Sequence, residues 1–463
     1  MVLYFPRRKL RIFLLAFILV VGFLGLIYSN ILWKWDDGTE NFIGNKHNNK
    51  EPVAPNEDAG PKGLHLPVLA ISPLPTKSNH VNNDQPDKNS IVQIDEKASV
   101  YDPSSWPPAN YDVHVFYYSW YGNPEHDQQW HHWNHRYLPH WDEKISRNYP
   151  TGRHTPPDDI GANFYPELGA YSSKDPQVID RHMFEIRKAR IGVIAVSWYP
   201  NKQADSEGTP PDRLIPLLLD AAAKYDIKLC FHIEPFDERT AYSLREAIKY
   251  IIDKYGSHKA FYRRRRKGRD LPLFYMYDSY QVQVKEWKKL FSVLESMTVR
   301  NTEYDGIFIG LAVESNHLPQ IYNAGFDGLY TYFASNSFVY GSRPSHWNSM
   351  SKYCKEREML FIPSVGPGYI DTEVRPWNNI NTKDRDNGRY YRTNFKKALI
   401  SLPDIISITS FNEWHEGTQI EAAVSHDRGG GKEYIDYGGT GKQSMYMDLT
   451  RELIESMPST LKT

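Results

Sequence analysis

The feature that most constrains the fold is a repeated alternation of short apolar segments with longer amphipathic segments, which begins near residue 110. The apolar segments are rich in β-branched and aromatic residues and lack an alternating polar pattern, as expected for strands buried on both faces. Strands that alternate with helices pair in parallel through right-handed crossovers. The pattern therefore predicts an α/β fold with a parallel sheet.

The alternation contains about eight strand–helix units, the number found in a (β/α)8 barrel. The predicted strands are residues 113–118, 192–198, 227–233, 271–277, 306–311, 328–333, 360–364 and 405–411. The predicted helices are residues 176–190, 212–225, 241–255, 282–296, 317–324, 345–356, 391–402 and 444–456. We therefore expect a barrel, with an open doubly wound sheet as the alternative. No Gly-rich phosphate loop follows a strand, which weakens a nucleotide-binding interpretation.

Aromatic, acidic and amide residues recur where the predicted strands end, which is where a barrel places its active site. These residues are Tyr117, Tyr118, Trp120, Trp198, Tyr199, His232, Glu234, Phe236, Tyr277, Asp278, Glu314, Tyr330, Tyr332, Asn336, Tyr369, Arg375 and Trp377. Such a lining is typical of a carbohydrate site, because rings stack on sugar faces while carboxylates bind hydroxyls. The 14% aromatic content is in keeping with this interpretation.

The last predicted strand ends in the run Asn412, Glu413, Trp414, His415 and Glu416. A carboxylate beside a buried strand is costly unless it is paired or functional. For either glutamate alone, a solvated loop that caps a helix is the alternative explanation. The aromatic and amide neighbours weaken that explanation, because a Trp beside paired acids is typical of a sugar site, so we predict that Glu413 and Glu416 belong to one.

Five segments resemble those of glycoside hydrolase family 99, and the similarity extends from about residue 111 to the end of the chain. They are residues 410–421 (SFNEWHEGTQIE), 115–124 (VFYYSWYGNP), 197–200 (SWYP), 231–235 (FHIEP) and 363–371 (PSVGPGYID), the last followed by Arg375-Pro376-Trp377. The resemblance implies a (β/α)8 barrel that acts as a retaining endo-α-1,2-mannosidase. Its expected substrates are glucosylated high-mannose N-glycans in the Golgi, from which it would release a glucosyl-mannose fragment.

The resemblance also implies roles for individual residues. Glu413 would be the general base that activates the mannose 2-hydroxyl, which attacks the anomeric carbon and forms a 1,2-anhydro sugar. Glu416 would be the general acid for the departing oxygen and then the base for water. The candidate substrate-binding residues, taken from the resemblance and from the strand ends, are Tyr118, Trp120, Trp198, Tyr199, Glu234, Tyr332, Tyr369, Asn412, Trp414 and His415.

A glycan-binding or scaffolding barrel with little or no catalysis is the alternative function. The presence of both glutamates argues against it, because a lectin does not need an acid–base pair.

The amino-terminal part of the chain predicts a membrane anchor. A basic cluster, Arg7 to Arg11, precedes an apolar run without a small-residue cleavage site, which favours a signal anchor over a removed signal peptide. We expect a cytoplasmic tail at 1–11, a transmembrane anchor at 12–33, a disordered lumenal stalk at 34–105 and the barrel at 106–463. The chain would then be a single-pass type II Golgi membrane protein with a lumenal catalytic domain.

Composition limits the remaining functions. A net charge of -1 gives no overall footprint for nucleic acid, and the basic run 263–267 is interpreted as a solvated loop. His131, His132 and His135 lack the spacing of a zinc site, so we expect no metal and no cofactor. Cys230 and Cys354 are predicted to be buried thiols.

Overall fold

Eight parallel strand segments form the barrel wall in the computed structural model, which describes residues 106–200, 203–204, 207–208, 211–429 and 433–458. The segments are β1 (Asn110–Tyr117), β3 (Ile191–Trp198), β4 (Lys228–Ile233), β6 (Arg269–Met276), β7 (Ile307–Leu311), β8 (Gly328–Tyr330), β9 (Leu360–Ile362) continued by β10 (Ser364–Val365), and β11 (Ile406–Ile408). The ring closes at Pro363, because β9 pairs with β8 while β10 pairs with β11.

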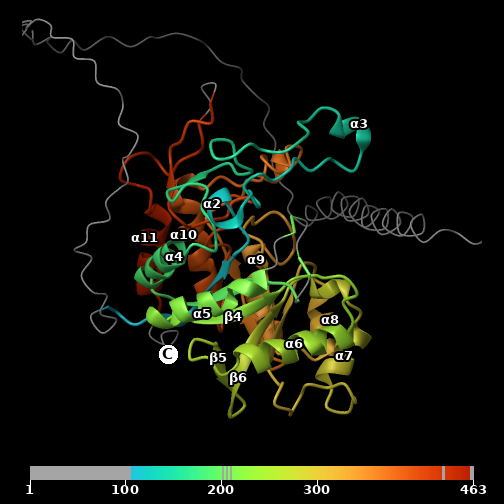
Figure 1. The fold of residues 1–463 in the computed structure, drawn as a ribbon. Coiled ribbons are helices and arrows are strands. Elements are labelled where there is room, and N and C mark those ends of the chain that lie inside the picture. The colour runs from blue at the N-terminus through green and yellow to red at the C-terminus, as the bar shows by residue number, and fades with distance from the viewer. Residues whose placement is uncertain (1–105, 201–202, 205–206, 209–210, 430–432, 459–463) are drawn as a thin grey trace, which may run out of the picture. The chain divides into compact units, whose positions relative to one another are not determined.

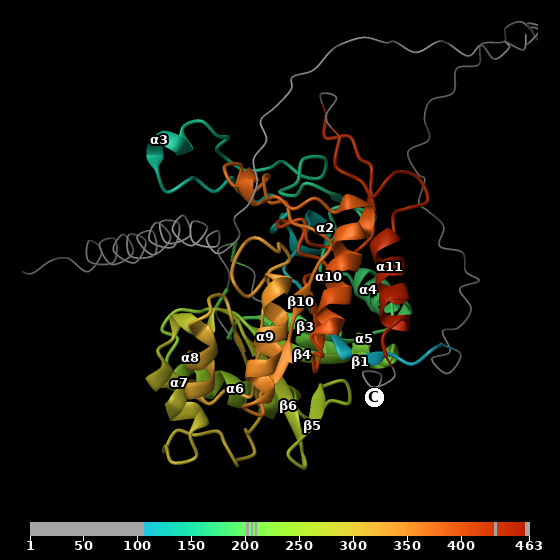
Figure 2. The same ribbon diagram turned by 180° about the vertical axis from the view of Figure 1, so that it is seen from behind.

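A helix follows each of these segments and covers the outside of the ring (Figures 1 and 2). The helices are α4 (Pro176–Lys188), α5 (Ile215–Lys224), α6 (Ala241–Tyr255), α7 (Val284–Phe291), α8 (His317–Ala324), α9 (Pro344–Lys355), α10 (Arg389–Ile400) and α11 (Met445–Glu455). Their starts follow local sequence signals: the Asp175 side chain caps α4 ahead of Pro176, and Thr240 forms a capping box on α6. The arrangement is that of the predicted (β/α)8 barrel.

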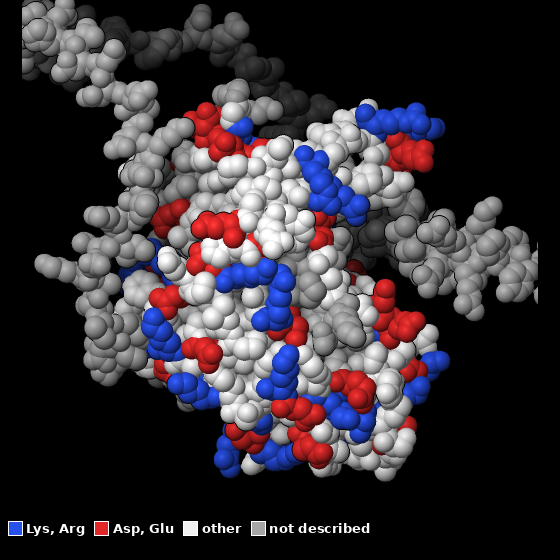
Figure 3. Space-filling view, in the orientation of Figure 1, with Lys and Arg blue, Asp and Glu red and all other residues white. Residues whose placement is uncertain are grey.

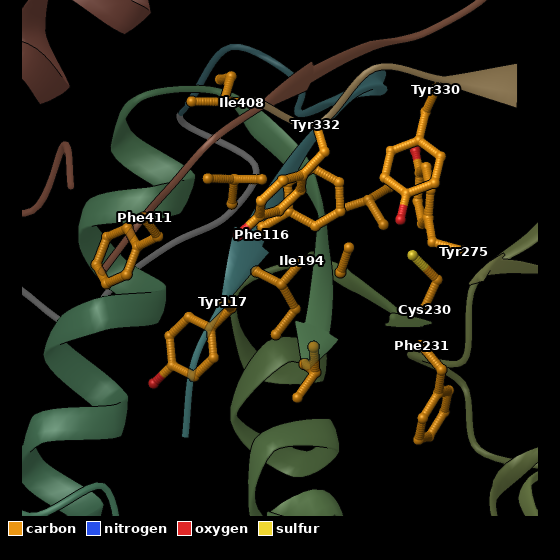
Figure 4. Close-up of a cluster of buried hydrophobic side chains, with 14 of the residues drawn as sticks. Phe116, Tyr117, Ile194, Cys230, Phe231, Tyr275, Tyr330, Tyr332, Ile408 and Phe411 are labelled. Atoms are coloured by element: carbon orange, nitrogen blue, oxygen red, sulfur yellow. The ribbon is translucent and has the colours of Figure 1, made fainter. Parts of the chain in front are cut away.

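The interior of the barrel is filled mainly by aromatic rings. Figure 4 shows Phe116 and Tyr117 pointing to opposite sides of β1, as the two-residue period of a strand requires. Phe116 lies inside, with ring centroids 5.4 Å from Tyr275 and 5.1 Å from Tyr332. Tyr117 faces outward, where its hydroxyl lies 2.9 Å from Nδ1 of His182 on α4. The interior rings around Phe116 therefore form the floor of the site.

The connections at the carboxyl ends of the strands are long and carry their own short elements. They include α2 (Pro124–Asp127), α3 (Glu143–Ser146) and an antiparallel pair of β2 (Tyr165–Pro166) with β12 (Ala423–Val424). The pair joins the loop after β1 to the loop after β11. Figure 1 shows these connections gathered above the barrel wall.

The interpretation of residues 263–267 as a solvated loop is wrong. Residues Arg263–Arg266 form β5, which pairs antiparallel with the start of β6. Two of the arginines, two residues apart, neutralise carboxylates: Arg264 pairs with Asp112 and Arg266 with Asp327. Elsewhere on the face in Figure 3, basic and acidic side chains are interspersed. Several predicted elements are also shorter than expected: β8 ends at Tyr330, β11 at Ile408 and α7 at Phe291.

Both ends of the described domain lie at the rim opposite the strand carboxyl ends. The Asn110 side-chain amide at the start of β1 is 3.6 Å from the Met457 sulfur just after α11. Arg190, just before β3, lies 3.8 Å from Glu455 at the end of α11. Within the described residues no helix is long and apolar enough to span a membrane. The predicted tail (1–11), anchor (12–33) and stalk (34–105) lie outside them.

Candidate active site

The loop after β11, residues 409–421, closes on itself at the centre of the barrel mouth. The Ser410 N–H donates to the Thr418 carbonyl at 2.9 Å, and the Ile420 N–H donates to the Ser410 carbonyl at 3.0 Å. The hydroxyls of Ser410 and Thr418 are also 2.9 Å apart. These contacts fix the base of the loop, so that the residues between them, including both predicted catalytic glutamates, form a defined turn.

Glu413 is buried within this turn, with 3% of the residue exposed. Its N–H donates to Ser410 Oγ at 2.8 Å, and its carboxylate accepts the His415 N–H at 3.2 Å. Burial raises the pKa of Glu413 well above its usual value, and the negative charge of Glu416 raises it further, while Arg375 opposes both effects. Glu413 therefore holds a proton more tightly than an exposed carboxylate does.

Glu416 is more accessible, with 22% of its side chain exposed. Its Oε1 lies 4.0 Å from Arg375 Nη1. Burial raises the pKa of Glu416 to about 7, with Arg375 opposing the shift and Asp371 and Glu234 adding to it. The two carboxyl groups repel one another and therefore retain a proton between them near neutral pH, as an acid–base pair requires.

Arg375 is fixed by a buried carboxylate. Asp371 accepts from Arg375 Nη1 at 3.1 Å, from the Tyr369 hydroxyl at 3.0 Å and from the Asn378 amide at 2.9 Å. The predicted sugar contact Tyr369 is 7% exposed, and its hydroxyl is directed to Asp371. Tyr369 therefore supports the arginine that faces Glu416.

Three tyrosines and a third acid, Glu234, stand at the ends of other strands. The hydroxyls of Tyr118 and Tyr332 share a hydrogen bond, and Tyr277 packs edge-on against Tyr332 with centroids 4.8 Å apart. Glu234 accepts from Ser197 Oγ at 2.8 Å. Burial raises the pKa of Tyr118, and the negative charges of Glu413 and Glu234 raise it further. Both carboxylates therefore lie close enough to act on the Tyr118 hydroxyl. The structure thus brings together Glu413, Glu416, Glu234, Tyr118 and Tyr332, as predicted.

Three other predicted sugar contacts belong to the loop itself, and their side chains are buried. Asn412 uses its amide to bind both the N–H and the C=O of Tyr118, each at 2.8 Å. Trp414 is fully buried and donates its indole N–H to Glu421 at 3.0 Å. His415 Nδ1 lies 2.7 Å from the Gly161 carbonyl oxygen. Their polar atoms are engaged by protein, so we assign them to holding the loop and Tyr118 in place.

Trp198 does not face the interior of the barrel. Its ring lies outside the barrel wall, fully buried, and its indole N–H donates to Asp212 at 2.9 Å. The prediction of a sugar contact is wrong because Ser197 occupies the inward position and bonds Glu234, which directs the next residue outward. Tyr199 and Trp120 are both partly exposed, and Trp120 packs on Tyr118 with centroids 4.6 Å apart.

Sequence reasoning assigned no individual role to two residues that shape the site. Arg375 was noted after a strand end and in a motif, and its position beside Glu416 makes it the principal charge partner. Glu421, which closes the same motif as the glutamate pair, accepts hydrogen bonds from Trp414, Tyr171 and His182. Motif membership was the available signal for both residues.

No set of three or more His, Cys, Asp or Glu side chains in the described parts of the chain is arranged to hold a metal ion. The histidines of the loops contact one another instead: His132 Nδ1 is 3.3 Å from His415 Nε2. Burial lowers the pKa of His415, and the neighbouring His135 and His132 lower it further. His415 is therefore a neutral packing partner within the loop.

Comparison with known proteins agrees with this geometry. The sequence profile of Glycosyl hydrolase family 99 matches residues 108–458. A glycoprotein endo-alpha-1,2-mannosidase from Xenopus laevis is 52% identical over 395 residues, which are 85% of this chain and 87% of that protein. A glycoprotein endo-alpha-1,2-mannosidase-like protein from Homo sapiens is 52% identical over 345 residues, covering 74% of this chain and 75% of that protein.

A solved structure extends the similarity to three dimensions. The GH99 endo-alpha-mannosidase from Bacteroides thetaiotaomicron superposes with a TM-score of 0.68 at 46% identity, covering 74% of this chain and 96% of that one. The family match spans the whole described barrel, including the loop that carries Glu413 and Glu416. The chain therefore belongs to glycosyl hydrolase family 99 and is a glycoside hydrolase.

Proposed function

We propose that this enzyme is an endo-α-1,2-mannosidase that cuts within the glucosylated arm of a high-mannose N-glycan and releases a glucosyl-mannose fragment with retention of configuration. The observation that carries the proposal is the turn after β11, which carries both Glu413 and Glu416, places Glu416 Oε1 4.0 Å from Arg375 Nη1 and raises the pKa of both acids. Family membership and relatives with that printed activity support the linkage and the endo-acting mode.

The mechanism that fits these residues uses a hydroxyl of the substrate as nucleophile. Glu413 removes the proton from the mannose 2-hydroxyl, and O2 attacks the anomeric carbon to give a 1,2-anhydro sugar. Glu416 donates its proton to the oxygen that leaves the anomeric carbon. In the second step, Glu416 removes a proton from water, which attacks the anomeric carbon, and Glu413 returns a proton to O2. Two successive inversions give overall retention.

A conventional retaining glycosidase places its two carboxyl groups across the scissile bond, about 5–5.5 Å apart, with one of them as nucleophile. Here both acids come from one turn, and Glu413 is the more deeply buried of the two. A buried base beside Tyr118 suits the removal of a hydroxyl proton, and the more accessible Glu416 suits exchange with water. These features favour participation of the 2-hydroxyl.

The first prediction concerns the product. The purified protein, incubated with a glucosylated high-mannose glycan, should release a glucosyl-mannose disaccharide or a larger fragment, as seen by mass spectrometry. An intact glycan after prolonged incubation would favour the glycan-binding alternative. Free mannose as the first product would contradict endo action.

The second prediction concerns the division of roles between the glutamates. Glu416→Gln should lose about 10²–10⁴-fold on the natural glycan, because it can no longer protonate the leaving oxygen. It should regain much of this activity on a glycosyl fluoride, whose leaving group needs no acid. Glu413→Gln should be inactive on both substrates. A 2-deoxy substrate provides the control: its cleavage with retention by the unmodified enzyme would make Glu413 a direct nucleophile.

The third prediction concerns pH. Glu416 must carry a proton to act as the acid, so kcat/KM should fall as the pH rises through about 7, the raised pKa of this group. Because the Arg375 charge lowers that pKa, Arg375→Gln should move the alkaline limb upward by about one pH unit. Arg375→Lys keeps the charge and should move the limb less. The pH dependence of kcat/KM measures both, and a limb that stays fixed or moves downward would remove Arg375 from this role.

We also propose that the enzyme is a type II Golgi membrane protein with its barrel in the lumen. The basic cluster before the apolar run at 12–33 supports this orientation. As the fourth prediction, protease added to sealed microsomes should leave the barrel intact and should degrade it once detergent is present. Digestion without detergent would sink the proposed topology.

A further inference from the structure

Arg385 lies directly behind the loop that carries the glutamates. It precedes α10, and the residue is 9% exposed. Its Nη2 donates to two carbonyl oxygens of the loop, that of Gly417 at 3.0 Å and that of Gln419 at 2.8 Å. Three aromatic rings surround the guanidinium carbon, with centroids 4.4 to 4.9 Å away: those of Phe164, Tyr446 and Tyr437.

This burial of a cation is not explained by an ion pair. None of the salt bridges among the described residues includes Arg385, and its Nε and Nη1 have no hydrogen-bond partner there. A buried charge is costly unless its surroundings stabilise it. The stabilisation here comes from the two loop carbonyls and the ring faces. The polar contacts of Arg385 are thus directed at the segment immediately after Glu416.

The two glutamates differ in what holds them. Glu413 is fixed from within the loop, because its N–H bonds Ser410 Oγ and its carbonyl accepts the Thr418 N–H. The segment of Glu416 has one bond from within the loop, from the Gly417 N–H to the Trp414 carbonyl at 3.2 Å, and two from outside: the Glu416 carbonyl accepts the Ile370 N–H at 2.9 Å, and the next carbonyl accepts from Arg385. Loss of Arg385 should therefore disturb Glu416 more than Glu413.

The backbone after Glu416 makes this outside support necessary. Gly417 has a φ of +58°, in the left-handed region, where the chain reverses. A Cβ on Gly417 would lie 2.6 Å from the Ile370 carbonyl oxygen, so the turn presses closely against the neighbouring loop. The direction of the Glu416 side chain depends on this turn, and Arg385 holds its carbonyl.

We propose that Arg385 is a positioning residue that aims Glu416 at the departing oxygen by clamping the carbonyls of Gly417 and Gln419. The proposal rests on the role of Glu416 as general acid. Arg385 itself does not touch the sugar. Removing the clamp should weaken proton donation while leaving the activation of the 2-hydroxyl by Glu413 largely in place.

The test compares two substrates in one preparation. Arg385→Met preserves side-chain length and apolar packing but lacks donors. It should lose about 10- to 100-fold in kcat on the glycan, as expected for a misplaced catalytic group, with little change in KM. On a glycosyl fluoride, measured by fluoride release, the loss should be much smaller. Because the ratio of the two activities cancels the folded fraction, partial unfolding cannot imitate this result. Arg385→Lys, which can keep one carbonyl contact, should be intermediate.

Arg300 provides a control away from the glutamate loop. Its guanidinium binds the carbonyls of Gly306 and Gly325, each at 2.7 Å, and lies 5.0 Å from the rings of both Phe291 and Phe308. Unlike Arg385 it also pairs with two carboxylates, Asp305 at 3.2 Å and Asp327 at 2.7 Å. Arg300→Met should lower the melting temperature but reduce activity on the two substrates equally. A selective effect in Arg300→Met, equal to that in Arg385→Met, would overturn the proposal.

Chemical rescue gives a second readout. A cavity of about 420 Å³ adjoins Arg385 and is lined by Tyr369, Lys383, Asp386, Gly417 and Tyr437 among others. In Arg385→Ala, added guanidinium ion should enter this space and restore glycan cleavage, whereas ammonium ion of equal concentration should restore less. Rescue by neither cation would count against the clamp.

The outcomes separate this inference from the proposed function. If Glu416→Gln is not restored by the fluoride, the assignment of Glu416 as acid fails. If Glu416→Gln is restored but Arg385→Met loses activity equally on both substrates, the acid assignment stands and only the positioning role of Arg385 is refuted.

Discussion

The repulsion between two neighbouring carboxyl groups, one buried and one partly exposed, is the constraint on which the construction of the site depends. Burial raises the pKa of both Glu413 and Glu416, and the charge of Glu416 raises that of Glu413 further. The folded protein therefore binds protons more tightly than the unfolded chain. Its stability declines as the pH rises from the usual value of 4.5 toward about 7, where Glu416 ionises. The same shifts make an acid–base pair available near neutral pH.

Such a pair needs rigid supports, and these come from connections that follow different strands. The loop after β1 contributes Tyr118, which the Asn412 amide grips at its backbone. The loop after β10 contributes Asp371 and Arg375, whose charge partly offsets the repulsion. Hydrogen bonds within the β11 loop fix its base. These supports follow three neighbouring strands, β10, β11 and β1, so the geometry of the pair depends on this part of the barrel rim.

The barrel could be predicted because its signal is local. Strands covered on both faces read as uninterrupted apolar runs, and each one alternates with a helix of distinct periodicity. The glutamate pair was assigned to the site because two acids beside a buried strand have few structural explanations, and its catalytic role stays a prediction. The structure of the segment 263–267 could not be predicted, because its arginines pair with Asp112 and Asp327, which are far away in the sequence.

The prediction of the site was limited because the sequence does not show in which direction each side chain points. Trp198 and Ser197 occupy adjacent positions at the end of β3, yet one packs outside the wall and the other bonds Glu234 inside it. Beyond a strand the two-residue period no longer applies, so nothing in the sequence showed that Asn412 and Trp414 turn into protein. The contacts of Arg385 could not be predicted for a related reason. Its partners are backbone carbonyls, which every residue possesses.

The two ends of the barrel domain meet at one rim, where Asn110 lies against Met457. The loop that carries Glu413 and Glu416 occupies the other rim. The chain therefore enters and leaves the described barrel on the side opposite the glutamates, so neither end of the described residues contributes to the mouth.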